Sequence, residues 1–147
     1  MIKKLTIPVD HGNRNMKTTH FLFTTGLSST DRKPAGREDF LQTEGKYYVL
    51  SGKRIPYQRD KTQDERFSIL TRFAIAKELE RTGQVAEEDV VQVSLPIGVP
   101  PKHYAELADR YREYFLGDGK VQELVYNGRT YHTCIRDVAV YPQAYAA

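Results

Sequence analysis

The residues best suited to chemistry lie in one short segment, Asp10-His11-Gly12-Asn13-Arg14-Asn15-Met16-Lys17. Gly12 permits a close backbone approach, and Asn13 tolerates a left-handed conformation. Successive amides in such a turn can form an anion-binding nest, and Lys17 can place a point charge on a phosphate. Asp10 cannot bind phosphate directly, but it suits the water shell of a Mg²⁺ ion. The segment therefore predicts a polyphosphate site.

The neighbouring residues predict that this segment is the tip of a β-hairpin. Lys3–Val9 is the expected strand before it, and Met16–Thr25, rich in Thr and Phe, is the expected strand after it. A strand–turn–strand arrangement excludes a P-loop and a dinucleotide-binding turn, because both lead from a strand into a helix. A purely structural interpretation stays open, since many hairpin turns contain Gly and Asn, and Asp10 can simply cap the turn.

Strands and helices alternate along the rest of the chain. Gly26–Gly45 is predicted to be an exposed loop, and Ile55–Gln58 an edge strand at best. Further strands are expected at Lys46–Leu50, Asp89–Leu95, Val121–Tyr126, Arg129–Cys134 and Ile135–Tyr141.

Two amphipathic helices are expected, one from Thr62 to Gly83 and one over His103–Leu116. Thr62 and Glu65 have the spacing of a capping box. Pro96 and Gly98 are expected to end the preceding strand, and Asn127-Gly128 predicts a type I′ turn. This order of elements indicates an α/β domain with a mixed sheet.

The Asp10–Lys17 segment resembles the first phosphate hairpin of the superfamily of actin, sugar kinases and heat-shock chaperones, whose pattern is Asp-x-Gly-x-x-x-x-Lys. Asp10, Gly12 and Lys17 match that pattern at the right spacing. Asn15 matches an Asn that plasmid-segregation actins of the ParM kind often carry. Other segments are similar to the same branch, so that the resemblance spans nearly all of the chain: Lys46–Gly52, Asp60–Phe67, Ala74–Leu79 and Val93–Gly98.

Near the end of the sequence, Val140-Tyr141-Pro142-Gln143 resembles the family's Pro-Glu or Pro-Gln site, which positions the attacking water. A second interpretation of this segment stays open. A Pro-Gln pair after a strand can simply begin a helix, because Pro is favoured in the first helical turn.

The resemblance implies the N-terminal domain of a bacterial actin-like ATPase of the plasmid-segregation (ParM/StbA-like) family. The implied fold is an α/β, actin/ribonuclease-H-like mixed-sheet domain over residues 1–147, with a main lobe of about 1–27 and 62–147 and a small inserted lobe of about 28–61. ATP and Mg²⁺ would lie between two related domains. Asp10 would organise the Mg²⁺ shell and Gln143 would orient the hydrolytic water. The implied phosphate-binding residues are Gly12, Asn13, Arg14, Asn15 and Lys17.

The same resemblance implies self-association into filaments and a DNA-bound adaptor protein. The family's second phosphate loop and its adenosine-binding glycines have no counterpart in the sequence, so the isolated chain is expected to be inactive as an ATPase. Two other functions stay open: a non-enzymatic domain that regulates filaments, and part of a small-molecule kinase of the same superfamily. A continuation with Asp-x-Gly-Gly-Thr would favour the ATPase. The family pattern assigns no role to His11.

Composition narrows the remaining classes of function. The net charge is only +3, and acidic and basic residues are interspersed, so direct nucleic-acid binding is not expected. No apolar run approaches the roughly 20 residues of a membrane span, so no membrane partner is expected. The lone Cys134 cannot form an internal disulfide and is read as a small buried hydrophobe in a cytoplasmic protein. His20, His103 and His132 lack the spacing of a metal site.

Overall fold

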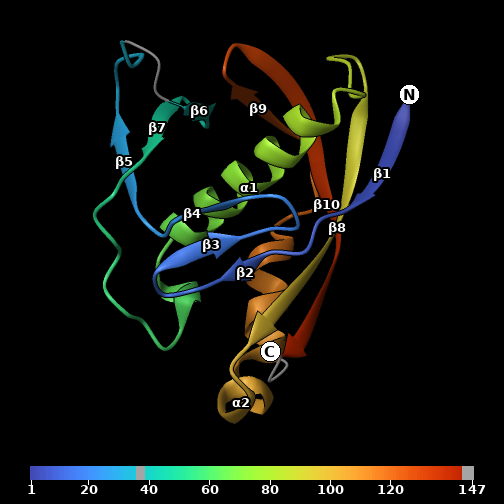
Figure 1. The fold of residues 1–147 in the computed structure, drawn as a ribbon. Coiled ribbons are helices and arrows are strands. Elements are labelled where there is room, and N and C mark those ends of the chain that lie inside the picture. The colour runs from blue at the N-terminus through green and yellow to red at the C-terminus, as the bar shows by residue number, and fades with distance from the viewer. Residues whose placement is uncertain (36–38, 144–147) are drawn as a thin grey trace.

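The structure is a computed structural model that describes residues 1–35 and 39–143. Within them the chain forms ten strands, two α-helices and a 3₁₀ turn (Figure 1). The helical elements are η1 (Lys61–Gln63), α1 (Arg66–Thr82) and α2 (Pro101–Leu116). The strands are β1 (Ile2–Thr6), β2 (Asp10–His11), β3 (Asn15–Lys17), β4 (Leu22–Thr24), β5 (Leu27–Thr30), β6 (Phe40–Thr43), β7 (Lys46–Leu50), β8 (Val90–Val99), β9 (Gln122–Tyr126) and β10 (Arg129–Pro142).

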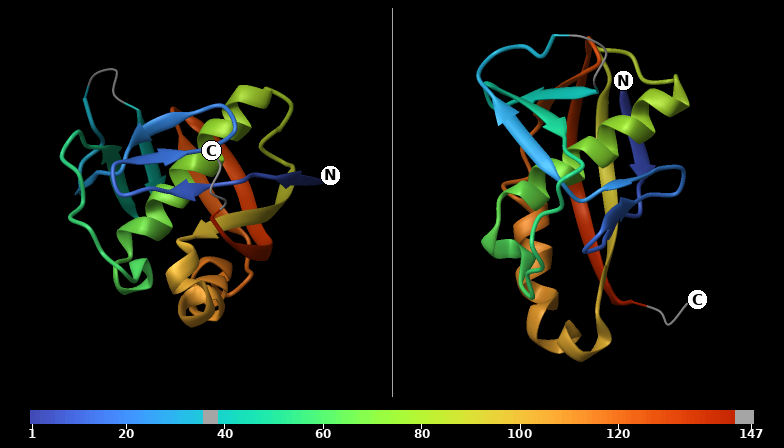
Figure 2. Two further views of the ribbon diagram at one scale, coloured as in Figure 1. Left: turned by 60° about the horizontal axis from the view of Figure 1, so that its bottom comes forward. Right: turned by 60° about the vertical axis from the view of Figure 1, so that its left-hand side comes forward.

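A seven-stranded sheet of order β1-β8-β10-β9-β6-β7-β5 forms the body of the domain. Strand β8 runs parallel to β1 and β10, and the other pairs are antiparallel. Strands β2, β3 and β4 form a separate small sheet that packs on α1 through buried Met16 (Figures 1 and 2). The predicted α/β fold with a mixed sheet is confirmed.

Strand β8 is the centre of the core, and it is longer than predicted. Its ten residues alternate between buried and half-buried, and the strand continues through Pro96 and Gly98 to Val99. The predicted end at Pro96 is therefore wrong. Pro96 is tolerated because the amide donor that it lacks would face the side where β1 has already ended, and on that side its carbonyl still accepts a 3.0 Å hydrogen bond from the amide of Val9. This extension brings Ile97 beside Val9, just before β2 begins.

Both predicted helices are present, but the start of α1 differs. The capping box of Thr62 and Glu65 does not form, because the Thr62 hydroxyl donates to Asp60 Oδ1 and the residues from Lys61 wind into η1. Gly83 ends α1 with a φ of 63°, as predicted. Helix α2 begins two residues earlier than expected, at Pro101, since Pro fits the first turn of a helix.

The segment from residue 16 to residue 58 shows most of the wrong predictions. Met16–Thr25 is not one strand but two, β3 and β4, reversed by a turn in which the Thr18 amide donates to the Phe21 carbonyl. The expected loop Gly26–Gly45 contains β5 and β6, although its residues 36–38 lie outside the described residues. Ile55–Gln58 forms no strand; instead Ile55 is buried and its amide donates to Thr25.

The inserted lobe remains a prediction. Strands β5, β6 and β7 are hydrogen-bonded to the main sheet, because β6 pairs with β9 at Leu41–Tyr126 and Gln42–Val125. Lys46–Leu50 forms β7 with the predicted bounds. Within the described residues this segment therefore continues the main sheet, and the division into a main lobe and an inserted lobe stays a prediction.

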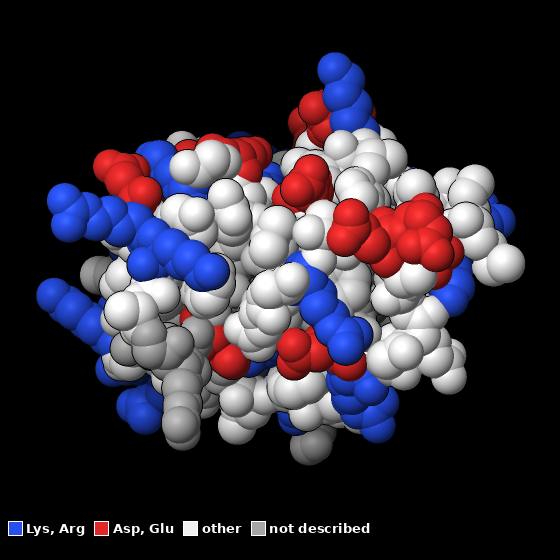
Figure 3. Space-filling view, turned by 90° about the horizontal axis from the view of Figure 1, so that it is seen from above, with Lys and Arg blue, Asp and Glu red and all other residues white. Residues whose placement is uncertain are grey.

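The C-terminal hairpin follows its prediction closely. Asn127 and Gly128 have φ angles of 50° and 83°, as a type I′ turn requires. The two strands predicted after the turn are one, β10, whose register shifts between Ile135 and Asp137. The face seen in Figure 3 carries both acidic and basic side chains, with a group of acidic ones on the right. Neither helix in the described part of the chain is long and apolar enough to cross a membrane.

Candidate functional site

The Asp10–Lys17 segment forms the predicted hairpin. Asp10 pairs with Lys17 and His11 pairs with Met16, which leaves residues 12–14 as the turn. A Cβ on Gly12 would lie 2.5 Å from the Asn15 carbonyl oxygen, closer than non-bonded atoms approach. Gly12 is therefore required by the tightness of the turn itself.

Thr25 holds this turn through two hydrogen bonds to its backbone. Its hydroxyl donates a 2.8 Å hydrogen bond to the Gly12 carbonyl, and its amide donates a 2.9 Å bond to the Arg14 carbonyl. Thr25 is buried, whereas the side chains of the turn and of Lys17 are exposed. The turn is thus anchored on one side and open on the other. No pattern in the sequence pointed to Thr25, because its partners lie more than ten positions away.

Asp10 and Gln143 meet, as predicted. Gln143 Nε2 donates a 3.1 Å hydrogen bond to Asp10 Oδ1, and the Gln143 amide donates a 2.7 Å bond to the Val99 carbonyl. A Cβ on Gly98 would lie 2.6 Å from Gln143 Cγ, so the absence of a side chain at position 98 makes room for Gln143. Gln143 directly follows β10; the alternative that the Pro-Gln pair begins a helix concerns residues 144–147, which lie outside the described residues.

These residues line an open groove of about 860 Å³ beside the hairpin. Asp10 and Lys17 lie on one side of it, Gln143 with Tyr141 and Pro142 on another, and the end of β8 forms the floor around Ile97 and Gly98. Charged and amide groups therefore face an accessible space, which suits a polar ligand. The groove brings together Asp10, Lys17 and Gln143; Asn13, Arg14 and Asn15 stand on the exposed turn above β2 and β3.

The groove could hold a metal ion only through water, because it offers a single carboxylate, Asp10. Among the described residues, no three His, Cys, Asp or Glu side chains come together as a ligand set. Asp10 is the one carboxylate among the residues that line the groove. Mg²⁺ usually keeps several waters and takes few protein ligands in nucleotide sites, so a lone Asp10 fits an ion completed by water and phosphate oxygens.

His11, to which the sequence assigned no role, connects the hairpin to both helices. Its side chain is buried, its Nε2 lies 2.7 Å from Thr71 Oγ1 on α1, and its ring lies 4.6 Å from the Phe115 ring on α2. Thr71 Oγ1 donates to the Phe67 carbonyl, so it accepts from His11 Nε2. Burial, with a smaller contribution from the nearby Lys61 cation, lowers the pKa of His11 to about 3. The imidazole is therefore neutral at ordinary pH.

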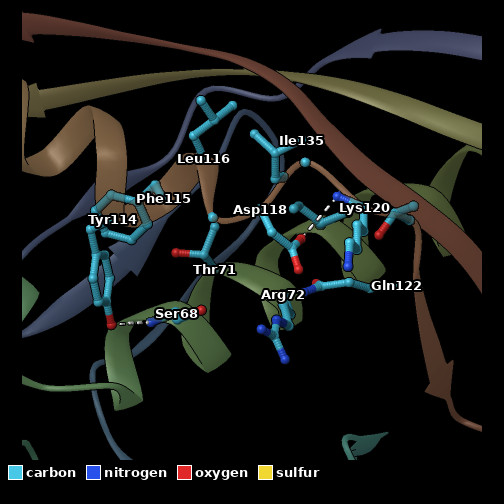
Figure 4. Close-up of a pocket in the computed structure, with 14 residues that line it drawn as sticks. Ser68, Thr71, Arg72, Tyr114, Phe115, Leu116, Asp118, Lys120, Gln122 and Ile135 are labelled. Atoms are coloured by element: carbon cyan, nitrogen blue, oxygen red, sulfur yellow. Dashed lines mark hydrogen bonds between the residues drawn. The ribbon is translucent and has the colours of Figure 1, made fainter.

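A second, smaller cavity of about 50 Å³ lies between α1, the end of α2 and the start of β10 (Figure 4). Arg72 and Lys120 stand at its rim, and Tyr114 closes one end by accepting from the Ser68 amide and donating to the Asp64 carbonyl. Burial raises the pKa of Tyr114 to about 12. Tyr114 thus joins the two helices.

His20, His132 and Cys134, which the sequence analysis also considered, do not line the groove. His20 Nδ1 lies 2.8 Å from Glu78 Oε1, and Glu78 Oε2 accepts from the Thr18 hydroxyl at 2.6 Å, so Glu78 fastens the β3–β4 turn to α1. Cys134 is half-buried, less enclosed than predicted. His132 Nδ1 lies 2.8 Å from the Glu87 carbonyl, and this pairing is structural.

Comparison with known proteins agrees with the family that the sequence of the hairpin resembles. The sequence profile of the family described as "Actin like proteins N terminal domain" matches residues 8–145. The chain belongs to this family of actin-like proteins. No curated protein sequence matches this actin-like domain.

Solved structures of actin-like proteins share its fold. The apo ParM protein of pSK41 superposes with a TM-score of 0.72 at 14% identity, covering 96% of this chain and 50% of that one. The AlfA filament bound to AMPPNP gives 0.71 at 15% identity, covering 96% and 55%. The archaeal actin homologue Ta0583 gives 0.68 at 17% identity, covering 94% and 45%. The actin-like domain thus spans about half the length of these proteins.

Proposed function

We propose that this actin-like domain supplies one wall of the ATP site of a filament-forming ATPase that segregates plasmid DNA in the bacterial cytoplasm. The single observation that carries this proposal is the hydrogen bond between Asp10 and Gln143 beside the Gly12 turn. It joins the residue expected to organise Mg²⁺ to the residue expected to orient water. Such a juxtaposition is what phosphoryl transfer to water needs, because that chemistry depends chiefly on positioning and charge neutralisation.

In this proposal the exposed turn binds the polyphosphate. The carbonyls of Gly12 and Arg14 are held by Thr25, which leaves the exposed side of the turn to the ligand. The side chains of Asn13, Arg14 and Asn15 supply donors there. Lys17, opposite Asp10 in the hairpin and lining the same groove, supplies a cation.

Asp10 and Gln143 would then serve the terminal phosphate. Asp10 Oδ1 accepts from Gln143 Nε2, which leaves Gln143 Oε1 free to accept a hydrogen bond from the attacking water. The second oxygen of Asp10 is available to the waters around Mg²⁺, which would neutralise charge developing on the transferred phosphoryl group. The amide orientation follows from chemistry, since a carboxylate can only accept.

The assembly part of the proposal draws on the related structures. Both AlfA and Alp12 are described as filaments, and AlfA is described as bound to an ATP analogue. We therefore propose self-association of the protein that contains this domain, with a DNA-bound adaptor as the link to the plasmid.

The test uses a protein that contains this domain together with the second actin-like domain. Phosphate release and sedimentation with Mg-ATP are compared for wild type, Gln143→Ala and the matched control Gln42→Ala on β6. We expect Gln143→Ala to reduce turnover by about 100-fold, which is the typical rate loss when one group that positions a reactant is removed. Polymers should still sediment. Equal turnover in all three proteins would remove Gln143 from the mechanism. Sedimentation with another protein's filaments, without nucleotide dependence, would support a filament regulator instead.

A further inference from the structure

Thr25 is a buried residue whose polar groups are all hydrogen-bonded to distant parts of the chain. Its hydroxyl donates a 2.8 Å bond to the Gly12 carbonyl, and its amide donates a 2.9 Å bond to the Arg14 carbonyl. Its own carbonyl accepts a 2.8 Å bond from the amide of Ile55, which is also buried. Thr25 itself is only 1% exposed. It therefore connects the Gly12 turn to the segment that follows β7.

The residue after Thr25 keeps this connection from shifting. A Cβ on Gly26 would lie 2.4 Å from the carbonyl oxygens of both Ser51 and Lys53, so only glycine allows the two chain segments to pass this closely. The Gly26 carbonyl also accepts a 3.0 Å hydrogen bond from the Ser51 amide. The Thr25 hydroxyl is therefore held in place by contacts that lie outside the turn.

The two bonds from Thr25 set the direction of two amides in the turn. In a planar trans peptide, the carbonyl of one residue and the N–H of the next point in opposite directions. The Gly12 carbonyl points to Thr25, so the N–H of Asn13 points away from it. The Arg14 carbonyl also points to Thr25, so the N–H of Asn15 points away as well. Both donors are thus turned away from the buried Thr25, in a turn whose residues 13–15 are exposed.

Residues 12–15 lack the hydrogen bond that usually closes such a turn. In a tight four-residue turn, the carbonyl of the first residue commonly accepts from the amide of the fourth. Gly12 and Asn15 hold these positions, because the β2–β3 ladder ends at the pair of His11 and Met16. In the part of the chain that the structure describes, no backbone hydrogen bond joins Gly12 to Asn15, and the Gly12 carbonyl is bonded to the Thr25 hydroxyl instead. The Asn15 N–H is therefore left for a ligand.

We propose that Thr25 is a positioning residue of the phosphate site: by engaging the Gly12 carbonyl, its hydroxyl keeps the amides of Asn13 and Asn15 free to donate to a phosphate. This inference rests on the proposed nucleotide site. Thr25 is buried, so it acts only through the backbone of the turn. Backbone amides that point to one side of a turn suit an oxyanion. Without the hydroxyl, the Gly12 carbonyl would take the Asn15 amide as its donor, and the turn would consume a group that the ligand needs.

Thr25→Val tests this role, because valine keeps the shape of the side chain and replaces the hydroxyl with a methyl group. In the free chain, this variant should protect the Asn15 amide from hydrogen exchange better than the wild type does, although it has lost a hydrogen bond. Its affinity for Mg-ATP should fall by about tenfold, the effect of one charge-assisted hydrogen bond. Thr25→Ser keeps the hydroxyl, so it should bind Mg-ATP as the wild type does.

The experiment titrates the 147-residue chain with Mg-ATP up to millimolar concentration and follows the backbone amides of residues 12–15 by NMR. Wild type, Thr25→Val and Thr25→Ser are compared with the control Thr43→Val. Thr43 is also buried, its hydroxyl also donates to a backbone carbonyl, that of Glu123, and it does not line the groove. Exchange rates of the Asn15 amide and melting temperatures are measured on the same samples. We expect the higher Kd and the slower Asn15 exchange in Thr25→Val alone.

The outcomes separate this inference from the proposed function. Amide shifts at residues 12–15 with equal Kd in wild type and Thr25→Val would overturn the role of Thr25 and leave the nucleotide site intact. The absence of any shift in the wild type would overturn both. A lowered melting temperature in Thr25→Val with an unchanged Kd would assign Thr25 to stability alone. If Thr25→Val does not fold, the wild type still decides, since an Asn15 amide already protected without nucleotide would contradict the inference.

Discussion

Gly98 lies directly beneath the side chain of Gln143, so closely that a single added Cβ would come within 2.6 Å of Gln143 Cγ. The strand β8 would have ended before this point had Pro96 broken it. Because β8 continues, Gly98 forms the floor of the groove and Gln143 reaches across it to Asp10. The position of Gln143, the group proposed to orient water, thus depends on a glycine that has no role of its own in the proposed reaction.

We therefore expect Gly98→Ala to impair turnover more than stability. The methyl group would displace the flexible Gln143 side chain, which moves at little cost, but Gln143 would lose its contact with Asp10. Stability should change by less than about 1 kcal/mol, while ATP turnover in the two-domain protein falls by about tenfold or more. Melting temperature and phosphate release measure the two effects. Gly52→Ala is the control, because a Cβ there meets nothing within 4 Å; equal turnover in the two variants would contradict the prediction.

Asp10→Ala should abolish ATP turnover in the two-domain protein and leave the domain folded. Asp10 is exposed, and its contacts are strand pairing with Lys17 and the hydrogen bond to Gln143, so the loss of stability should stay within about 0.5 kcal/mol. The loss of its role toward Mg²⁺ should be far larger. Melting temperature and phosphate release are compared with Asp109→Ala, an exposed helical control. A clearly lowered melting temperature with normal turnover per folded molecule would make Asp10 only a turn residue.

The buried His11 predicts an acid-sensitive fold. Its folded pKa of about 3 lies below the unfolded value of 6.5, so below pH 6.5 the unfolded state binds a proton that the folded state does not. The stability due to neutral His11 is therefore complete above pH 6.5 and is lost as the pH falls toward 3, by up to about 1.4 kcal/mol per pH unit. Urea unfolding between pH 6.5 and 4.5 measures this slope.

His11→Gln is the matched variant for that measurement, since an amide can still donate to Thr71 but does not titrate in this range. Its profile should be flatter between pH 6.5 and 4.5. The carboxyl groups with lowered pKa, Asp64 and Glu78, keep their stabilising effect until the pH falls through their folded values, below this window. Identical slopes for wild type and His11→Gln would show that His11 is protonated in the folded state.

The chain on its own should bind Mg-ATP weakly. The groove is open, and one hairpin with a single lysine, Lys17, offers few contacts against the loss of ligand freedom. We expect a Kd weaker than about 100 µM by calorimetry. Submicromolar affinity would mean that this domain holds the nucleotide without a second wall.

Local spacing was enough to determine several parts of this protein. Asn127-Gly128 specified its turn, the apolar periodicity specified α1 and α2, and Gly12 specified a tight hairpin tip. These features depend on residues only a few positions apart, so they can be predicted from short stretches of the sequence. The resemblance to actin-like proteins assigned Asp10 and Gln143 to one site, which no local pattern could have done, since the two residues are separated by 133 positions. Their hydrogen bond came from the structure.

Only the tertiary structure decided the features that depend on distant partners. Pro96 remains within β8 because β1 ends before the donor that proline lacks would be needed, and β6 forms because β9 lies beside it. Thr25 anchors the Gly12 turn, and His11 joins the hairpin to both helices. The physical reason is common to all of them. Hydrogen bonding across a sheet and burial against a helix outweigh local propensity, and the residues that provide them are set by how the whole chain packs.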